Sequence, residues 1–207
     1  MKEYPVDVSS IPDASSIIVD DINTRIAARV RQLRADRGLA LEALAEASGV
    51  SRSMISLIER GESSPTAVVL EKLATGLGVP LASLFDPPAA PADPVSRRKQ
   101  QAEWRDPASG YLRRNVSPAG FPSPIHLVEV LFPPGARVAY ETGLRPGVTH
   151  QQIWVLQGEI EITLGRARHS LETGDCLAMV LDQPITFRNR SKKPARYAVV
   201  ICQDPRP

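Results

Sequence analysis

A chain of 207 residues is long enough for one large domain or two small ones, and its 43% of apolar residues can bury a core. Aromatic residues make up only 5%, so the core is expected to be mainly aliphatic. The formal net charge of +2 neither requires nor excludes a nucleic-acid partner. Any nucleic-acid-binding surface must therefore be a local one.

Cysteine usage and hydropathy restrict the compartment. Cys176 and Cys202 lie far apart and form no CxxC pair, so both are expected to be reduced core residues. The N-terminus has no basic stretch followed by a long apolar run, which argues against a signal peptide. No segment approaches the roughly 18 apolar residues of a membrane helix. We expect a cytoplasmic protein without membrane contact, in which residues 1–20 form a flexible tail.

Residues 21–85 carry the apolar period of helices. One face of a first helix is marked by Ile22, Ile26, Val30 and Leu33, and Gly38 ends this helix. Two short helices follow, one from residue 41 to the glycine at 49 and one within residues 49–61. A fourth helix is expected from Thr66, as its N-cap, to Leu77, and the segment "VPLASLF" closes the bundle.

A change of composition separates this helical part from the rest of the chain. Residues 86–106 begin with "DPPAAPADPVS", which is typical of a semi-rigid linker. Residues 107–204 contain short segments rich in Val, Ile, Leu and Thr, separated by proline and glycine: "IHLVEVLF", "QIWVLQG", "EIEITLG", "CLAMVL", "ITFRN" and "RYAVVIC". Their spacing predicts an all-β sandwich or barrel. We therefore expect an all-α domain followed by an all-β domain.

Two helices joined by a tight turn are expected in "LEALAEASGVSRSMISLIERG". Ala45 supplies a small side chain at the helix crossing, Gly49 tolerates a positive φ at the turn, and Ser51 can cap the second helix of the pair. The side chains that face outward form a continuous stripe: Arg52, Ser53, Ser56, Leu57 and Arg60. Most such stripes are solvated helix faces. This one contains no acidic residue, and its leucine could contact a thymine methyl group in a major groove.

The stretch "RQLRADRGLALEALAEASGVSRSMISLIERGESSPT" resembles the lambda-repressor-like, or XRE, helix-turn-helix family. The resemblance implies a five-helix bundle whose third helix enters the major groove of double-stranded DNA. It implies base contacts for the first four residues of the stripe, and phosphate contacts for Arg60 and the loop "GESSPT". The implied DNA-contacting residues are Ser51, Arg52, Ser53, Ser56, Leu57, Arg60, Ser63 and Thr66.

Two further family positions are structural. Arg34 and Glu59 occupy positions that pair as a partly buried salt bridge and hold the first helix to the third. Ala40 stands where the family usually has a Ser or Thr that caps the second helix. This departure removes a cap and a potential phosphate contact.

The segment from "HQQIWVLQGEIEITLG" to "RYAVVI" resembles the cupin family, an all-β double-stranded β-helix that forms a barrel. Cupins often bind iron, manganese or zinc through a His pair, a Glu and a third His. The Glu position falls on Gln151, the third His position falls on Ile185, and residues 144–147 contain no His pair. The Asn that closes the second motif is present as Asn189. The resemblance therefore implies the scaffold without a metal, another cofactor or catalytic residues.

A polar pocket is expected at the mouth of the barrel. The candidate ligand-binding residues are Tyr140, His150, Gln151, Gln152 and Trp154. Side chains alternate along a strand, so only half of the consecutive candidates can face inward, and the sequence leaves the parity open. Arg113, Glu129 and Arg137 are further pocket candidates.

Helix-turn-helix domains fused to single cupins resemble bacterial transcription regulators. This resemblance implies a sequence-specific DNA-binding regulator, taken to be a repressor, whose cupin domain senses a small molecule, dimerises, or does both. A homodimer is expected, because two recognition helices about one DNA turn apart bind a near-palindromic operator. Two alternatives stay open: a cupin enzyme with a DNA-binding appendage, and a constitutive DNA-binding protein whose cupin only dimerises.

Overall fold

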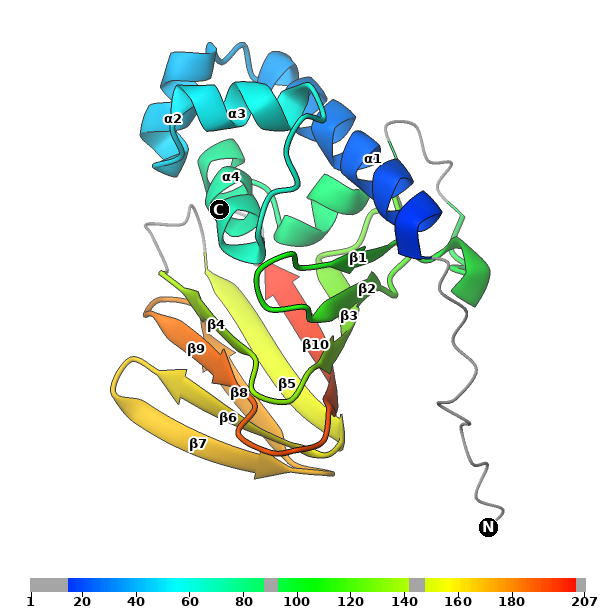
Figure 1. Ribbon diagram of the computed structural model, residues 1–207, viewed down its shortest axis with the longest axis vertical. Coiled ribbons are helices and arrows are strands. Elements are labelled where there is room, and N and C mark those ends of the chain that lie inside the picture. Colours follow the sequence, from blue (N-terminus) through cyan, green and yellow to red (C-terminus); the bar gives the residue numbers. More distant parts are fainter. Residues whose placement is uncertain (1–14, 88–92, 142–147, 204–207) are drawn as a thin grey trace.

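A helical domain sits on one end of a β domain in the computed structural model, which describes residues 15–87, 93–141 and 148–203 (Figure 1). The helical elements among these residues are α1 (Ser15–Asp36), α2 (Leu41–Ser48), α3 (Arg52–Glu59), α4 (Ala67–Leu77) and the 3-10 helices η1 (Leu81–Phe85) and η2 (Arg98–Gln100). The helix-turn-helix part therefore has four α-helices, and the expectation of five was wrong. In place of the fifth, η1 closes with an i→i+3 bond from the Ser83 amide to the Pro80 carbonyl, and Pro87 follows soon after its end.

The apolar face expected for the first helix forms the core of the helical domain. Ile26 and Val30 of α1 pack with Leu44 of α2, Ile55 of α3 and Leu70 of α4, and all five are fully buried. α1 begins at Ser15, which lies inside the segment assigned to the tail. None of the helices among the described residues combines the length and hydropathy needed to cross a membrane.

Close contact between α2 and α4 depends on a glycine inside α4. A Cβ atom at Gly76 would lie 2.8 Å from the Cβ of Ser48 and 2.9 Å from its backbone nitrogen. Ser48 is buried, and its hydroxyl donates to the Leu44 carbonyl at 2.6 Å. Glycine usually weakens a helix, so its presence here reflects packing rather than helix propensity.

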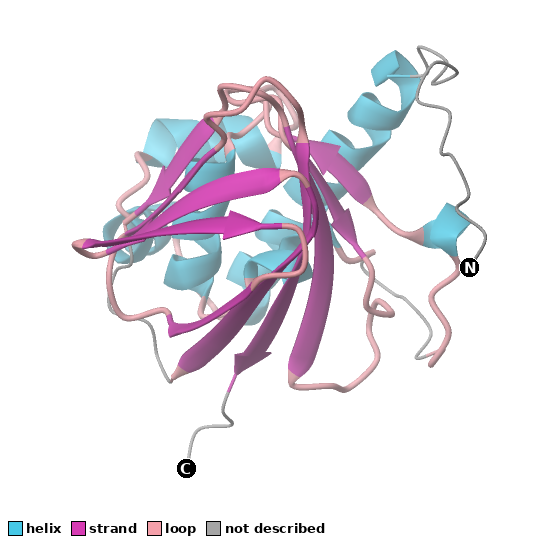
Figure 2. Ribbon diagram, turned by 90° about the horizontal axis from the view of Figure 1, so that it is seen from below, coloured by secondary structure: helices cyan, strands magenta, loops and turns pink. Residues whose placement is uncertain are grey.

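The β domain consists of two antiparallel sheets that face each other. Its strands are β1 (Glu103–Arg105), β2 (Leu112–Asn115), β3 (Ile125–Phe132), β4 (Arg137–Tyr140), β5 (Thr149–Gln157), β6 (Glu159–Leu164), β7 (Ala167–Glu172), β8 (Cys176–Val180), β9 (Ile185–Arg188) and β10 (Ala195–Gln203). The strand orders are β1-β2-β3-β10-β5-β8 and β4-β9-β6-β7. The sheets do not join into one closed barrel, which corrects the expectation of a closed β-barrel (Figure 2).

Strands that the apolar pattern did not predict are short or polar. β2 reads "LRRN" and β7 reads "ARHSLE", so neither has the apolar content of the six predicted segments. β1 lies within the residues assigned to the linker, because Trp104 is buried between Phe85 and Tyr111 and pulls this segment into the sheet. The expectation of core cysteines was wrong as well: Cys176 is exposed and Cys202 is half-buried.

The two domains are joined by packing and hydrogen bonds. α4 contacts β4, and α1 contacts β1. The Ala67 amide at the start of α4 donates to Asp106 Oδ1 at 2.9 Å, a buried bond. Asn115 Nδ2 donates to the Ala82 carbonyl of η1 at 3.1 Å. The helical domain is therefore held in one orientation against the end of the β domain.

Candidate nucleic-acid interface and buried cavity

α2, the turn at Gly49 and α3 form the helix-turn-helix unit that the sequence predicted. Gly49 has φ 66°, in the left-handed region, and the Ser51 hydroxyl accepts the Met54 amide at 3.3 Å as the N-cap of α3. Ala40 makes no side-chain cap, as expected from its methyl group. Figure 1 shows α2 and α3 on the side of the helical domain that is turned away from the β domain. The unit is thus open to a partner.

The expected division between the inner and outer sides of α3 is confirmed. Ile55 and Ile58 are buried beneath the helix. On the outer side, Arg52, Ser53 and Arg60 are exposed, while Ser56 and Leu57 are half-buried. The outer stripe is therefore a solvent-facing surface with basic residues at both ends.

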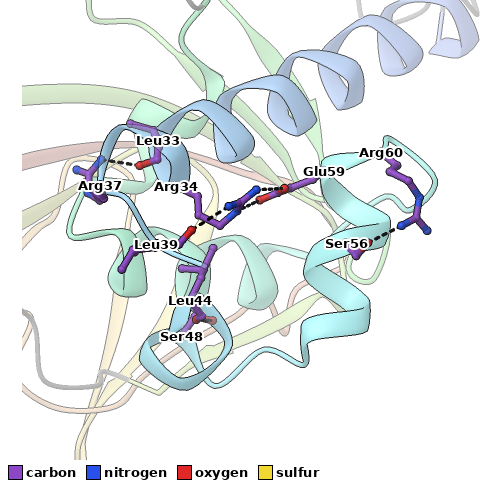
Figure 3. A network of polar contacts seen from close by, with 9 residues as sticks. All are labelled: Leu33, Arg34, Arg37, Leu39, Leu44, Ser48, Ser56, Glu59 and Arg60. Atoms are coloured by element: carbon purple, nitrogen blue, oxygen red, sulfur yellow. Dashed lines mark hydrogen bonds and ion pairs between the residues drawn. The ribbon is translucent and has the colours of Figure 1, made fainter. Parts of the chain in front are cut away.

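A buried ion pair ties α3 to α1 (Figure 3). Arg34 donates from Nε to Glu59 Oε1 at 2.6 Å, from Nη2 to Oε2 at 2.8 Å, and from Nη1 to the Leu39 carbonyl at 2.9 Å. The hydrogen bonds to Glu59 raise the pKa of Arg34, while burial acts in the opposite direction. The predicted salt bridge is confirmed, and it fixes the C-terminal end of α3.

Both arginines of the outer stripe hold carboxylates from neighbouring segments. Arg52 Nε lies 2.7 Å from Glu42 Oε1 of α2, and both side chains are 65% exposed. Arg60 donates to both oxygens of Glu62 at 2.8 and 2.7 Å. Figure 3 shows its second contact, to the Ser56 hydroxyl. The hydrogen bonds to Glu62 raise the pKa of Arg60. Exposed pairs of this kind are weak, so either arginine can exchange its carboxylate for another anion.

The remaining candidate DNA-contacting residues, Ser63 and Thr66, lie in the segment between α3 and α4. Thr66 Oγ1 accepts the Val69 amide at 3.4 Å and caps α4, as expected. Ser63 directs its hydroxyl to the sulfur of Met54 at 3.8 Å. A hydroxyl that accepts in a cap keeps its own hydrogen, so Ser51 and Thr66 can still donate to a phosphate.

A cavity of about 80 Å³ lies between the two sheets, at the end covered by the helical domain. The polar residues that the β domain contributes are Tyr111, Arg113, Tyr140, Thr149, Gln151, Tyr197 and Gln203, and aliphatic and aromatic side chains form most of the rest. The helical domain completes the lining with Glu71 of α4 and with Pro80 and Leu81 at η1. The cavity is therefore a site shared by both domains.

Two of the five predicted ligand-binding residues line this cavity, Tyr140 and Gln151. His150, Gln152 and Trp154 are instead exposed on the other face of β5 and do not line this cavity. β5 pairs with β8 and β10 without a register shift over these residues, so its side chains alternate strictly.

Of the three further pocket candidates, one lines the cavity and two do not. Arg113 is 6% exposed and lines the cavity. Glu129 instead forms ion pairs with Arg114 and Arg196, and Arg137 is exposed. Sequence reasoning missed Tyr111, Thr149, Tyr197 and the residues of the helical domain. Thr149 could have been found, since it lies two positions before Gln151 and shares its face.

The positions of the cupin metal motif are occupied by side chains that are poor ligands. Gln151 and Ile185 both line the cavity, whereas residues 144–147 lie outside the described part of the chain. Within the described ranges, no three His, Cys, Asp or Glu side chains come close enough to share a metal ion. Asn189 donates from Nδ2 to the Phe132 and Lys193 carbonyls at 3.1 and 2.8 Å, which is a structural role.

The tyrosines of the cavity are neutral at physiological pH, and burial moves their pKa values further above it. Burial raises the pKa of Tyr111, and raises those of Tyr140 and Tyr197 well above the usual value near 10. Each hydroxyl therefore retains a hydrogen at physiological pH and can act as a hydrogen-bond donor.

Comparisons with known proteins agree with both halves of the fold. A family model described as Helix-turn-helix matches residues 30–84, and one described as Cupin domain matches residues 128–202. The HTH-type transcriptional regulator SutR of Escherichia coli (strain K12) is 49% identical over 73 residues, which are 35% of this chain and 41% of SutR. The match thus spans less than half of that relative.

Two further relatives match over both domains. The HTH-type transcriptional regulator PuuR of Escherichia coli (strain K12) is 28% identical over 164 residues, covering 79% of this chain and 86% of PuuR. The crystal structure of a helix-turn-helix family transcriptional regulator from Vibrio cholerae superposes with a TM-score of 0.71 at 26% identity, covering 90% of this chain and 99% of that one. The chain therefore belongs to the helix-turn-helix transcriptional regulators of the XRE type, and its C-terminal part is a cupin domain.

Proposed function

We propose that the protein is a sequence-specific DNA-binding regulator, not an enzyme, and that α3 enters the major groove. One observation carries the proposal: α3 lies on the side of the helical domain opposite the β domain (Figure 1), and the polar and basic side chains of its stripe are exposed or half-buried. An eight-residue helix on a tight turn has the dimensions to enter a groove about 12 Å wide.

The proposed contacts follow from the chemistry of each side chain. Arg52, Ser53, Ser56 and Leu57 would meet base edges, with the Arg52 guanidinium bidentate on a guanine and Leu57 against a thymine methyl group. Phosphates would be bound by Arg60 and by the hydroxyls of Ser51, Ser63 and Thr66. Binding requires the two arginines to leave Glu42 and Glu62, and the weakness of exposed ion pairs makes this exchange inexpensive.

A homodimer is part of the proposal, because one short helix contacts too few bases to specify an operator. The outer face of the six-stranded sheet supports this. Trp154 (52% exposed), Ile125 and Val180 point away from the core on β5, β3 and β8, with Ala198 of β10 paired to Trp154. A second copy of the chain that covers this face would remove apolar surface from water. Trp154→Glu should then yield a folded monomer by light scattering with weakened operator binding.

The cavity supports an effector role for the cupin domain. Its lining includes residues of α4 and η1, so a bound molecule would contact the helical domain directly. A ligand changes DNA affinity only if it binds the DNA-competent and incompetent arrangements unequally. Because the proposed partner is chromosomal DNA, the proposal includes a cytoplasmic location.

The test is selection of genomic fragments by the purified protein at low salt, followed by sequencing. The expected result is an enriched near-palindrome with half-sites about one helical turn apart. Arg52→Ala should lose discrimination among half-site variants, whereas Arg188→Ala, on β9 of the other domain, should bind like wild type. A fragment pool without enrichment, or unchanged operator preference in Arg52→Ala, would refute base recognition by α3.

A further inference from the structure

One cationic side chain in the cavity is not fully satisfied. Arg113 is 6% exposed; its Nε donates to Asn115 Oδ1 at 3.3 Å, and its guanidinium lies 5.5 Å from the centre of the Phe85 ring. Its Nη2 is buried and has no hydrogen-bond partner. Unsatisfied buried donors are rare in folded proteins, and they are most costly on charged groups. Arg113 therefore carries unused donor capacity in the wall of the cavity.

Neutral hydroxyls and one carboxylate share the cavity with this guanidinium, since Tyr111, Tyr140, Tyr197 and Glu71 all belong to the lining. The positive charge of Arg113 partly offsets the effect of burial on the pKa values of the three tyrosines, whereas Glu71 raises those of Tyr111 and Tyr140. The hydroxyls of Tyr111 and Tyr140 lie 3.2 Å apart and share a single hydrogen bond. One of the two hydrogens is thus left to donate elsewhere.

Apolar side chains form most of the rest of the lining, which also contains Thr149, Gln151, Gln203 and the Glu71 carboxylate. Leu81, Val138, Ile185 and Phe187 supply apolar walls. At 10–15 Å³ for each water-sized group, a cavity of about 80 Å³ holds roughly five to eight such groups. The single charged donor, Arg113, together with neutral tyrosine hydroxyls and apolar walls, suits a short-chain carboxylic acid in its ionised form.

We propose that the effector is a small carboxylate whose oxygens accept from Arg113 and a neighbouring tyrosine hydroxyl while its apolar part contacts Leu81. The binding half of this inference stands on the cavity alone. The regulatory half rests on the proposed function, since it requires operator binding as its readout.

The same arginine provides a route to the DNA-binding domain. Arg113 stacks on Phe85, the last residue of η1, and η1 follows α4 directly. A carboxylate that draws the guanidinium into the cavity would change this contact, and its apolar part would press on Leu81 of the same element. A bound carboxylate therefore favours one arrangement of the two domains over the other.

Binding is measured with a single fluorescent reporter. Trp154→Phe leaves Trp104 as the remaining tryptophan of the chain, buried opposite Arg113 across the β1–β2 pair. Butanoate, butanamide and butylamine have similar size and differ in charge. Butanoate should change the Trp104 emission with saturation and raise the melting temperature, while the amide and the amine should do neither at equal concentration. Equal responses to all three, or no response to any carboxylate from acetate to hexanoate, would overturn the proposal.

Substitutions assign the effect to Arg113. Arg113→Gln should weaken butanoate binding at least about tenfold, the loss typical of a charge-assisted hydrogen bond. Arg137→Gln, an exposed arginine on β4, should bind butanoate like wild type. If Arg113→Gln does not fold, Tyr140→Phe and Arg113→Lys replace it, and wild-type affinity in both would contradict the assignment.

Operator binding separates the two proposals. Butanoate should shift the operator dissociation constant of the wild type and leave that of Arg113→Gln unchanged. Butanoate binding without any operator binding would refute the proposed function and keep the carboxylate site. Operator binding that butanoate leaves unaltered, in protein saturated with butanoate, would refute the regulatory half of the inference.

Discussion

The Arg34–Glu59 pair offers the sharpest test of how α3 is positioned. Both oxygens of Glu59 are used, at 2.6 and 2.8 Å, and the Glu59 side chain is only 7% exposed, against 18% for Arg34. Glu59→Ala leaves the guanidinium in a largely dry site with the Leu39 carbonyl as its remaining partner in this network. Removing one member of a buried pair costs about 3–5 kcal/mol, and the partial exposure of Arg34 favours the lower end, about 3 kcal/mol.

A double variant separates the cost of a stranded charge from the value of the pair. Arg34→Met combined with Glu59→Leu removes both charges and supplies apolar atoms of similar volume. Such replacements are commonly neutral or stabilising, so the double variant should lie within about 1 kcal/mol of wild type.

Urea unfolding followed by far-UV circular dichroism measures the free energy of unfolding of Glu59→Ala and of the double variant relative to wild type. Glu62→Ala is the matched control, since it breaks an ion pair that has the same two-point geometry but is exposed to solvent. Its unfolding midpoint should not move. If Glu59→Ala and Glu62→Ala unfold at the same urea concentration, burial does not govern the strength of these pairs and the reasoning fails.

Three further outcomes test the interface and the packing. Arg60→Ala should weaken binding to all DNA sequences and reduce the slope of log K against log salt by about 0.9, as loss of one phosphate contact requires; an unchanged slope would exclude that contact. Glu42→Gln frees Arg52 from its ion pair, so operator affinity should rise about two- to fivefold in a gel-shift assay, and equal or weaker binding would contradict the exchange. Gly76→Ala should lower the free energy of unfolding by about 1–3 kcal/mol, because the new methyl group would lie 2.8 Å from the Ser48 Cβ. This loss is expected although alanine favours helices. A more stable variant would show that α2 and α4 can separate at no cost.

The helical domain could be largely predicted because its signals are local. The caps at Ser51 and Thr66, the turn at Gly49 and the apolar spacing of α1 each depend on residues a few positions apart. The division of α3 into a buried and an exposed side follows from the same period. The fifth helix was implied by the family resemblance, and the segment that closes the bundle is instead the five-residue 3-10 helix η1.

The cavity could be predicted only in part, since its lining comes from distant segments. Local sequence indicated Tyr140 and Gln151 but also three outward-facing residues of β5, because alternation defines two faces and does not say which one is buried. That choice depends on the second sheet and on the pairing of β5 with β8 and β10.

What the sequence by itself determined is the order of the two domains, the helix-turn-helix unit and the surface that it presents, since helix period, caps and turn glycines act within one or two turns of chain. The tertiary structure alone decided that Arg113 lies buried beneath Phe85 and that Leu81 completes a cavity in the other domain. Such contacts join residues about thirty or more positions apart, so they depend on how the two hydrophobic cores pack against each other, and no local pattern encodes that packing.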